Sequence, residues 1–258
     1  MSLIPILVTA ESLTIVGSGT DLGTFKLLAE RFTYKYPDVQ IHILPSIGSG
    51  GSIRALNKND IDIALLSRPP KDSEKKSHIT FLHYATTPLV FAVHINFEIE
   101  NVTSQQIAAF YSGTETQWNN GTPVRPILRP KHDSDTLLIN AQLNITDEKN
   151  MAHSRKGLPV ALSDQDAADM IATVNGAFGP STLALILAEK RPLKALSLDG
   201  IAANPSNLQQ GKYPLHKPLY MAYANNNTKQ YPEKFISFLQ SKEGQDILNS
   251  TGHIVSSQ

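Results

Sequence analysis

Leu13-Thr14-Ile15-Val16-Gly17-Ser18-Gly19-Thr20 is the stretch that decides the fold. Its first half, residues 13–16, is a short β-type run, and the small residues that follow predict a tight turn. A helix is predicted next, because apolar side chains recur on one helical face at Leu22, Phe25, Leu28, Ala29 and Phe32. Strand, small-residue turn and helix together form the repeating unit of an α/β protein.

The same unit recurs further along the chain. Residues 39–44 predict a second strand, Gly48-Ser49-Gly50-Gly51-Ser52 a turn, and residues 53–56 a short helix before a third strand at 61–66. Such alternation predicts a parallel, right-handed sheet. Later strands are predicted at 88–93, 124–128, 194–198 and 219–224, and later helices at 104–110, 164–173 and 235–248.

Three small-residue segments precede predicted helices: residues 17–20, residues 48–52, and Asp133-Ser134-Asp135-Thr136. A helix N-terminus has unpaired N–H groups and about half a positive charge, so such a turn can hold an anion. Arg129 follows the strand at 124–128, at the sheet edge where α/β proteins bind ligands. Together these features predict an oxyanion site.

Composition excludes several other classes of protein. Lys plus Arg and Asp plus Glu each number 23 among 258 residues, so no global basic field points to nucleic acid or to an anionic membrane. The chain lacks cysteine and any apolar run long enough to span a membrane. Residues 1–10 lack the basic start of a secretory signal, so we expect a mature or trimmed chain.

Catalytic motifs are missing from the sequence. Residues 17–20 form neither a Walker loop nor a complete dinucleotide fingerprint, and no Gly-x-Ser-x-Gly elbow occurs. The eight histidines show no metal-binding spacing. We therefore predict binding without catalysis, with no catalytic residue, no metal and no cofactor.

Plainer interpretations apply to each feature taken alone. A single Gly/Ser/Thr turn is more often a helix cap than a ligand site. Arg129 alone would usually form a surface ion pair, and Tyr111 and Trp118 are expected to pack within their loop. The charged run at residues 72–76 is expected to be a solvated face.

Several short motifs occur in one order along the chain: residues 17–20, 47–51, 62–64, 67–69, Arg129 with 134–136, 176–179 and 211–215. With these motifs, nearly the whole chain resembles the phosphate-binding proteins of bacterial ABC importers. Residues 112–113, 118–119 and 241–245 are similar to that family as well.

The resemblance implies a two-lobed α/β fold of the type II periplasmic-binding-protein kind, with two parallel or mixed sheets, flanking helices and a cleft between the lobes. Lobe 1 would comprise residues 1–90 and 219–258, and lobe 2 residues 91–218. It further implies a monomer in the periplasm or at the cell surface that passes phosphate or a similar oxyanion to a membrane ABC permease.

By the same resemblance, the anion would be held by both lobes. Lobe 1 would contribute Gly19, Thr20, the backbone of Asp21, Ser49, Gly50 and Ser67, and lobe 2 would contribute Arg129, Ser134, Asp135 and Thr136. Arg129 would make the charged, forked contact. Alternative functions within this fold are an oxyanion-sensing module and a periplasmic phosphoesterase.

Two positions depart from the family pattern. Ser67 stands where phosphate-specific members often carry an Asp that accepts a ligand proton, and Arg68 beside it could turn toward the ligand or to solvent. Asp135 stands where the family has Gly. We expect its carboxylate to point away from the cleft, leaving only its N–H there. If a carboxylate instead faces the ligand, a shared proton would be needed, which would select phosphate over sulfate.

Overall fold

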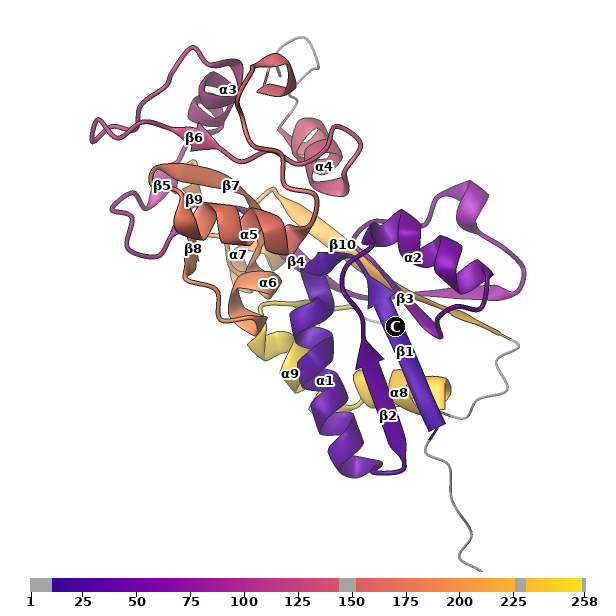
Figure 1. The fold of residues 1–258 in the computed structure, drawn as a ribbon. Helices are drawn as coiled ribbons and strands as arrows, with labels where there is room; N and C mark the ends of the chain where they lie inside the picture. The colour runs from indigo at the N-terminus through magenta and orange to yellow at the C-terminus, as the bar shows by residue number, and fades with distance from the viewer. Residues whose placement is uncertain (1–10, 144–151, 226–230, 257–258) are drawn as a thin grey trace, which may run out of the picture.

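The structure is a computed structural model that describes residues 11–143, 152–225 and 231–256. It shows two lobes of mixed α/β structure joined by long strands (Figure 1). The prediction about residues 1–10 lies outside the described residues. Among the described residues, no helix is both long and apolar enough to cross a membrane.

In lobe 1, the sheet has the strand order β2-β1-β3-β10-β4. β1 (Glu11–Gly17), β2 (Val39–Ile43) and β3 (Ile63–Leu66) run parallel to one another. β10 (His216–Ala224) is antiparallel to β3 and to β4 (Ile79–His94). The predicted parallel sheet is therefore confirmed only for the first three strands.

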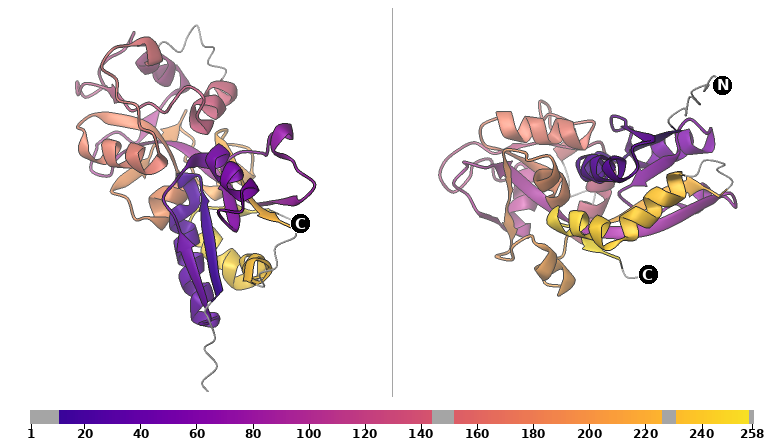
Figure 2. Two further views of the ribbon diagram at one scale, coloured as in Figure 1. Left: turned by 45° about the vertical axis from the view of Figure 1, so that its right-hand side comes forward. Right: turned by 90° about the horizontal axis from the view of Figure 1, so that it is seen from below.

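Helices cover both faces of this sheet, as Figure 2 also shows. α1 (Leu22–Lys35), α8 (Tyr231–Gln240) and α9 (Lys242–Ser250) pack on one face, in a core that includes the rings of Phe25, Phe32 and Phe235. α2 (Gly48–Asn57) packs against β3 in a separate core that contains Ile53 and Leu56.

Lobe 2 continues from the second half of β4. That half pairs with β7 (Ala177–Thr182) and β8 (Leu193–Ala195), and β6 (Arg125–Pro126) is parallel to β7. Two cores flank these strands, one with α3 (Ser104–Ser112) and α4 (Ser134–Gln142), the other with α5 (Asp164–Thr173) and α6 (Leu183–Ala188). The remaining elements are β5 (Asn101–Val102), β9 (Ser197–Leu198), α7 (Pro205–Gln209), β11 (Ile254–Val255), η1 (Gly19–Asp21), η2 (Asp72–Glu74) and η3 (Ala152–Ser154).

The chain crosses between the lobes within β4 and again within β10. On β4, Ala85 belongs to the core of lobe 1 and Leu89 to a core of lobe 2. Leu219 on β10 and Leu215 just before it divide in the same way. We propose lobes close to those that the sequence predicts, residues 1–90 with 219–258 and residues 91–218, with the change of core on β4 between Ala85 and Leu89, slightly before the predicted boundary.

Several local predictions need correction. Residues 235–248 do not form one helix, because Ser241 interrupts them and caps α9 by accepting a hydrogen bond from Gly244 N–H. The glycines at 48–51 are not a turn before α2 but form its first turn. Of residues 124–128, only β6 is a strand. The packing role of Trp118 is confirmed, since its buried ring contacts Phe97, Phe110 and Phe178.

Candidate functional site

A cavity of about 420 Å³ lies where the two lobes meet. Its wall combines the chain after β1, the start of α2, the segment before α4 and the start of α5. The lining residues are Ser18, Ser46, Ile47, Gly48, Ser49, Gly50, Arg68, Lys71, Arg129, His132, Asp133, Ser134, Leu162 and Asp164. Hydroxyls, helix starts and cations dominate this surface, as anion binding requires.

Serine side chains form the lobe 1 wall. Gly17 ends β1 where a Cβ atom would lie 2.2 Å from the Leu65 carbonyl oxygen, so only glycine fits beside β3. The chain then presents Ser18, whose hydroxyl donates to Ser67 Oγ at 2.9 Å. Ser49 Oγ accepts from the N–H of Ser67 at 3.1 Å. Hydrogen bonds to Ser67 therefore connect the predicted turns at residues 17–20 and 48–52 to the end of β3.

Arg129 is the charged residue of the lobe 2 wall. It is only 4% exposed, and its two terminal nitrogens donate to the Ala161 carbonyl and to Asp133 Oδ2, both at 3.0 Å. Its Nε has no hydrogen-bond partner in the described part of the chain. Burial disfavours the guanidinium charge, but the nearby carboxylates of Asp164, Asp135 and Asp133 outweigh it and raise the pKa of Arg129.

Contacts across the cavity join the two lobes. Ser67 Oγ lies 3.2 Å from Ser134 Oγ at the start of α4. Gln165 of α5 donates from Nε2 to the Gly19 carbonyl at 2.9 Å. A Cβ atom on Gly19 would lie 2.6 Å from Asp164 Oδ2, so Gly19 permits this close approach. The lobes are therefore closed on one another in this structure.

Lys217 is a central residue that the sequence did not predict. It lies on β10, is fully buried, and its Nζ donates to Thr20 Oγ1 at 3.1 Å and to Asp135 Oδ1. Asp164 Oδ1 lies 3.8 Å from the same Nζ. Burial disfavours the ammonium, but these two carboxylates outweigh it and raise the pKa of Lys217. The predicted residue Thr20 is thus tied to a buried cation.

Asp135 lies beside the cavity and not on its wall. Its own N–H is capped by Asp133 Oδ1 at 2.9 Å, and its side chain turns inward to Lys217 with 1% exposure. Burial, reinforced by Asp164 and Asp133 and opposed by Lys217 and Arg129, raises the pKa of Asp135 to about 6. The carboxylate is not among the groups that line the cavity, but lies beside it against a buried counter-ion, Lys217. That only the N–H of Asp135 would serve an anion stays a prediction.

Asp164, also missed by the sequence prediction, begins α5 and lines the cavity. Burial opposes its charge, yet Lys217, Arg129 and a hydrogen bond with the Asp135 carboxyl together lower the pKa of Asp164. Asp135 and Asp164 therefore share one buried counter-ion, the Lys217 ammonium.

Other predicted residues occupy mixed positions. Gly50 lines the cavity, whereas the Thr136 hydroxyl donates to the Arg129 carbonyl at 3.3 Å and does not line it. Arg68 forms two hydrogen bonds with Glu74 at the cavity wall, so it is neither free in solvent nor free toward a ligand. The Asp21 carboxylate faces His253 and Tyr84, which leaves its backbone as the part that could serve an anion.

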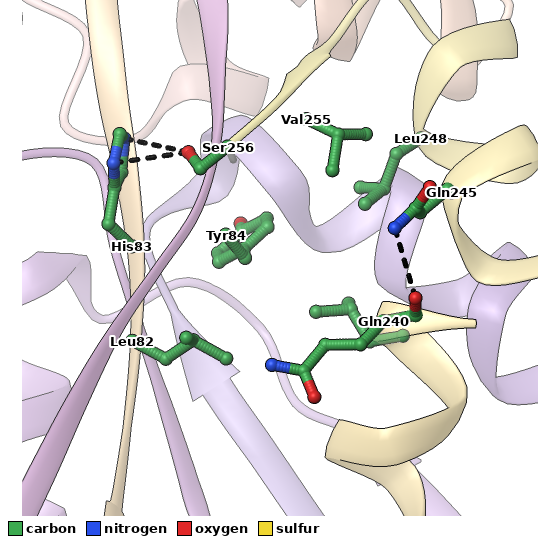
Figure 3. A pocket seen from close by; sticks show the side chains of 9 residues that line it. Leu82, His83, Tyr84, Gln240, Gln245, Leu248, Val255 and Ser256 are labelled. Carbon is green, nitrogen blue, oxygen red and sulfur yellow. Dashed lines mark hydrogen bonds between the residues drawn. The ribbon is translucent and has the colours of Figure 1, made fainter. Parts of the chain in front are cut away.

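A second cavity of about 410 Å³ lies between β4 and the helices α8 and α9 (Figure 3). Its wall includes His83, Gln245 and the ring of Tyr84, whose hydroxyl donates to Asp21 behind the first cavity.

Within residues 11–143, 152–225 and 231–256, no cluster of His, Asp or Glu side chains could hold a metal ion.

Comparison with known families decides the fold family. The model of the PBP superfamily domain matches residues 8–243 of the chain. The protein belongs to the PBP superfamily. This assignment agrees with the two-lobed α/β architecture, which matches type II periplasmic-binding-protein structures.

Individual PBP relatives are distant. Phosphate-binding protein PstS of Bacillus subtilis is 21% identical over 252 residues, covering 94% of this chain and 80% of that protein. PstS 2 of Streptococcus pneumoniae serotype 4 is 34% identical, but over only 64 residues, which are 25% of this chain and 22% of that relative. A structure with bound phosphate, from a Clostridium perfringens protein assigned as a phosphate ABC transporter substrate-binding protein, gives a TM-score of 0.82 at 23% identity, covering 96% and 100% of the chains.

Proposed function

We propose that this PBP superfamily protein captures inorganic phosphate, or a closely similar tetrahedral oxyanion, in the cavity between its lobes. The observation that carries the proposal is Arg129, a buried guanidinium that lines the cavity and whose Nε makes no hydrogen bond within the described residues. Serine hydroxyls and the starts of α2 and α4 surround it. A buried Arg fork beside helix N-termini is suited to an oxyanion.

The anion would be contacted by Ser49 and Gly50 from lobe 1 and by Arg129 and Ser134 from lobe 2, which line the cavity. The other residues that the sequence singles out stand beside these and do not line it in this structure: Gly19, Thr20, Asp21, Ser67, Asp135 and Thr136. We place the protein in the periplasm or at the cell surface, as a monomer that delivers its ligand to an ABC permease. The delivery to a permease is supported by the structural similarity to a protein assigned as a substrate-binding protein of a phosphate ABC transporter.

Binding without catalysis fits the surroundings of the serines. A nucleophilic serine needs a base within hydrogen-bond reach. In the described residues, the Ser67 hydroxyl instead contacts the hydroxyls of Ser18 and Ser134.

Calorimetric titration of ligand-stripped protein tests the proposal. Phosphate, sulfate and molybdate should be titrated separately, and we expect phosphate to bind one to one. Absence of binding by all three anions between pH 6 and pH 8 would exclude the proposed function. Turnover of a generic phosphomonoester in a parallel assay would instead identify a phosphoesterase.

A further inference from the structure

The cavity rests on a buried cluster with more acids than bases. Asp133, Asp135 and Asp164 surround the cations Arg129 and Lys217, and ion pairs link them all. Three carboxylates and two cations leave one net negative charge when every group is ionised. Although Arg68 and Lys71 also line the cavity, an anion that reaches Arg129 would thus meet a net negative charge in this cluster.

Asp135 holds the position that matters most in this cluster. Its Oδ1 accepts from Lys217 Nζ, and its Oδ2 lies 3.8 Å from the unpartnered Nε of Arg129. The carboxylate therefore acts as an internal counter-ion for both buried cations. An incoming anion that approaches Arg129 meets this negative charge at close range, where little water screens it.

A proton on the Asp135 carboxyl removes that disadvantage. In the described residues, its buried Oδ2 makes no hydrogen bond, and both Asp135 and Asp164 face Lys217 Nζ, so one proton on Asp135 brings the cluster to zero net charge while Lys217 keeps its place. An anion in the cavity adds negative potential and makes this protonation more favourable. By linkage, protonation then favours the anion to the same extent.

We propose that Asp135, held by Lys217, couples anion capture to the uptake of one proton from solvent. This inference rests on the proposed function, since it describes how the same cavity is regulated. Asp135 thereby sets the pH range in which the protein binds its ligand, and Lys217 is the positioning residue.

The other groups that face Asp135 do not supply this proton. Lys217 of β10 and Arg129 keep raised pKa values, and Asp133 is engaged by Arg129 and by the Asp135 N–H. From α3, burial and the nearby Asp135 raise the pKa of Tyr111 well above its usual range. From η1, the uncharged hydroxyl of Thr20 contacts Lys217. The carboxylate of the neighbouring Asp21 faces His253 and Tyr84 instead.

Calorimetry in two buffers of different ionisation enthalpy measures the proton directly. Sulfate is the preferred probe, because its charge is constant between pH 6 and pH 8; phosphate is the second probe. At pH 7.5 we expect the wild-type protein to take up about one proton per sulfate, and its affinity to rise about tenfold per unit of falling pH.

Asp135→Asn is the decisive variant, because an amide cannot take up this proton. We expect it to bind at pH 8 about as tightly as the wild type binds at pH 6, with one proton fewer taken up for either probe. Asp164→Asn serves as a second variant if Asp135→Asn does not fold. The matched control is Asp169→Asn, an exposed acid of the same helix α5, which should behave as wild type.

The possible failures are distinguishable. If neither wild type nor Asp135→Asn binds phosphate or sulfate at any pH tested, the proposed function fails. If both bind with the same proton uptake and the same pH dependence, the function stands and the coupling is overturned.

Discussion

The hydroxyl oxygens of Ser67 and Ser134 lie 3.2 Å apart although one residue directly follows strand β3 of lobe 1 and the other begins helix α4 of lobe 2. Ser18 extends the contact by donating to Ser67. The lobes thus meet through hydroxyl groups, each of which can exchange its partner for a ligand oxygen at small cost.

The first prediction compares Arg129→Ala with Ser134→Ala. Loss of a charge-assisted contact should weaken phosphate binding by about 10- to 100-fold, and loss of a neutral hydroxyl by about 2- to 10-fold. Calorimetric dissociation constants check this order. An Arg129→Ala protein that is folded and binds as tightly as wild type would contradict the role of Arg129.

The second prediction concerns closure at Gly19. In Gly19→Ala, the added methyl group would meet Gln165 Oε1 at 2.3 Å and Asp164 Oδ2 at 2.6 Å, so the lobes should stay further apart. Small-angle scattering should show a larger radius of gyration than for wild type. Gly50→Ala is the control, since its nearest contact would be 3.5 Å, and equal radii for all three proteins would refute the prediction.

The third prediction is about stability. Tyr84→Phe removes the hydroxyl that donates to the buried Asp21 carboxylate, leaving His253 as its remaining side-chain partner. The free energy of unfolding should fall by about 1–3 kcal/mol, measured by urea denaturation. Tyr34→Phe, at a ring that is 81% exposed, should change it by less than about 0.5 kcal/mol.

The fourth prediction concerns stability against pH. The folded-state pKa of Asp135 is raised from 3.8 to about 6, so the folded protein binds more protons than the unfolded chain between these values. Asp135 therefore contributes a loss of stability as pH rises through this window, on the order of 2–3 kcal/mol once complete.

Other titratable groups make the free energy of unfolding depend on pH in other ways, so wild type must be compared with Asp135→Asn. Burial lowers the pKa of His83, which makes stability rise with pH below about 6.5. Asp164, with its lowered pKa, loses its contribution only below 3.8. The difference in unfolding free energy between wild type and Asp135→Asn should therefore change between pH 4 and pH 6, and a constant difference would disprove the prediction.

The order of elements could be predicted wherever local pattern and burial agree. The stripe from Leu22 to Phe32 is one buried face of α1, and residues 164–173 coincide with α5. The break at Ser241 was missed because the apolar pattern continues across it in α8 and α9, while the serine cap is a local hydrogen bond.

The site could be predicted only where its residues share sequence motifs. Ser18, Ser49, Arg129 and Ser134 lie in or beside such motifs and do converge on the cavity. Lys217 could not be found in this way, since a lysine in a strand usually extends to solvent. Its burial depends on the carboxylates of Asp135 and Asp164, which lie far from it in the sequence.

The two crossings between the lobes are also neighbours in one ladder, with Lys217 opposite Thr87. Pro218 stands opposite Thr86 and Pro88 opposite His216, and proline cannot donate to a ladder. The rungs beside the Lys217–Thr87 pair are therefore weakened while both strands remain continuous. Opening of the lobes would then be a twist of the β4–β10 ribbon at these weakened rungs. Lys217 would lie near the axis of that twist, so its ammonium would move little when the lobes separate.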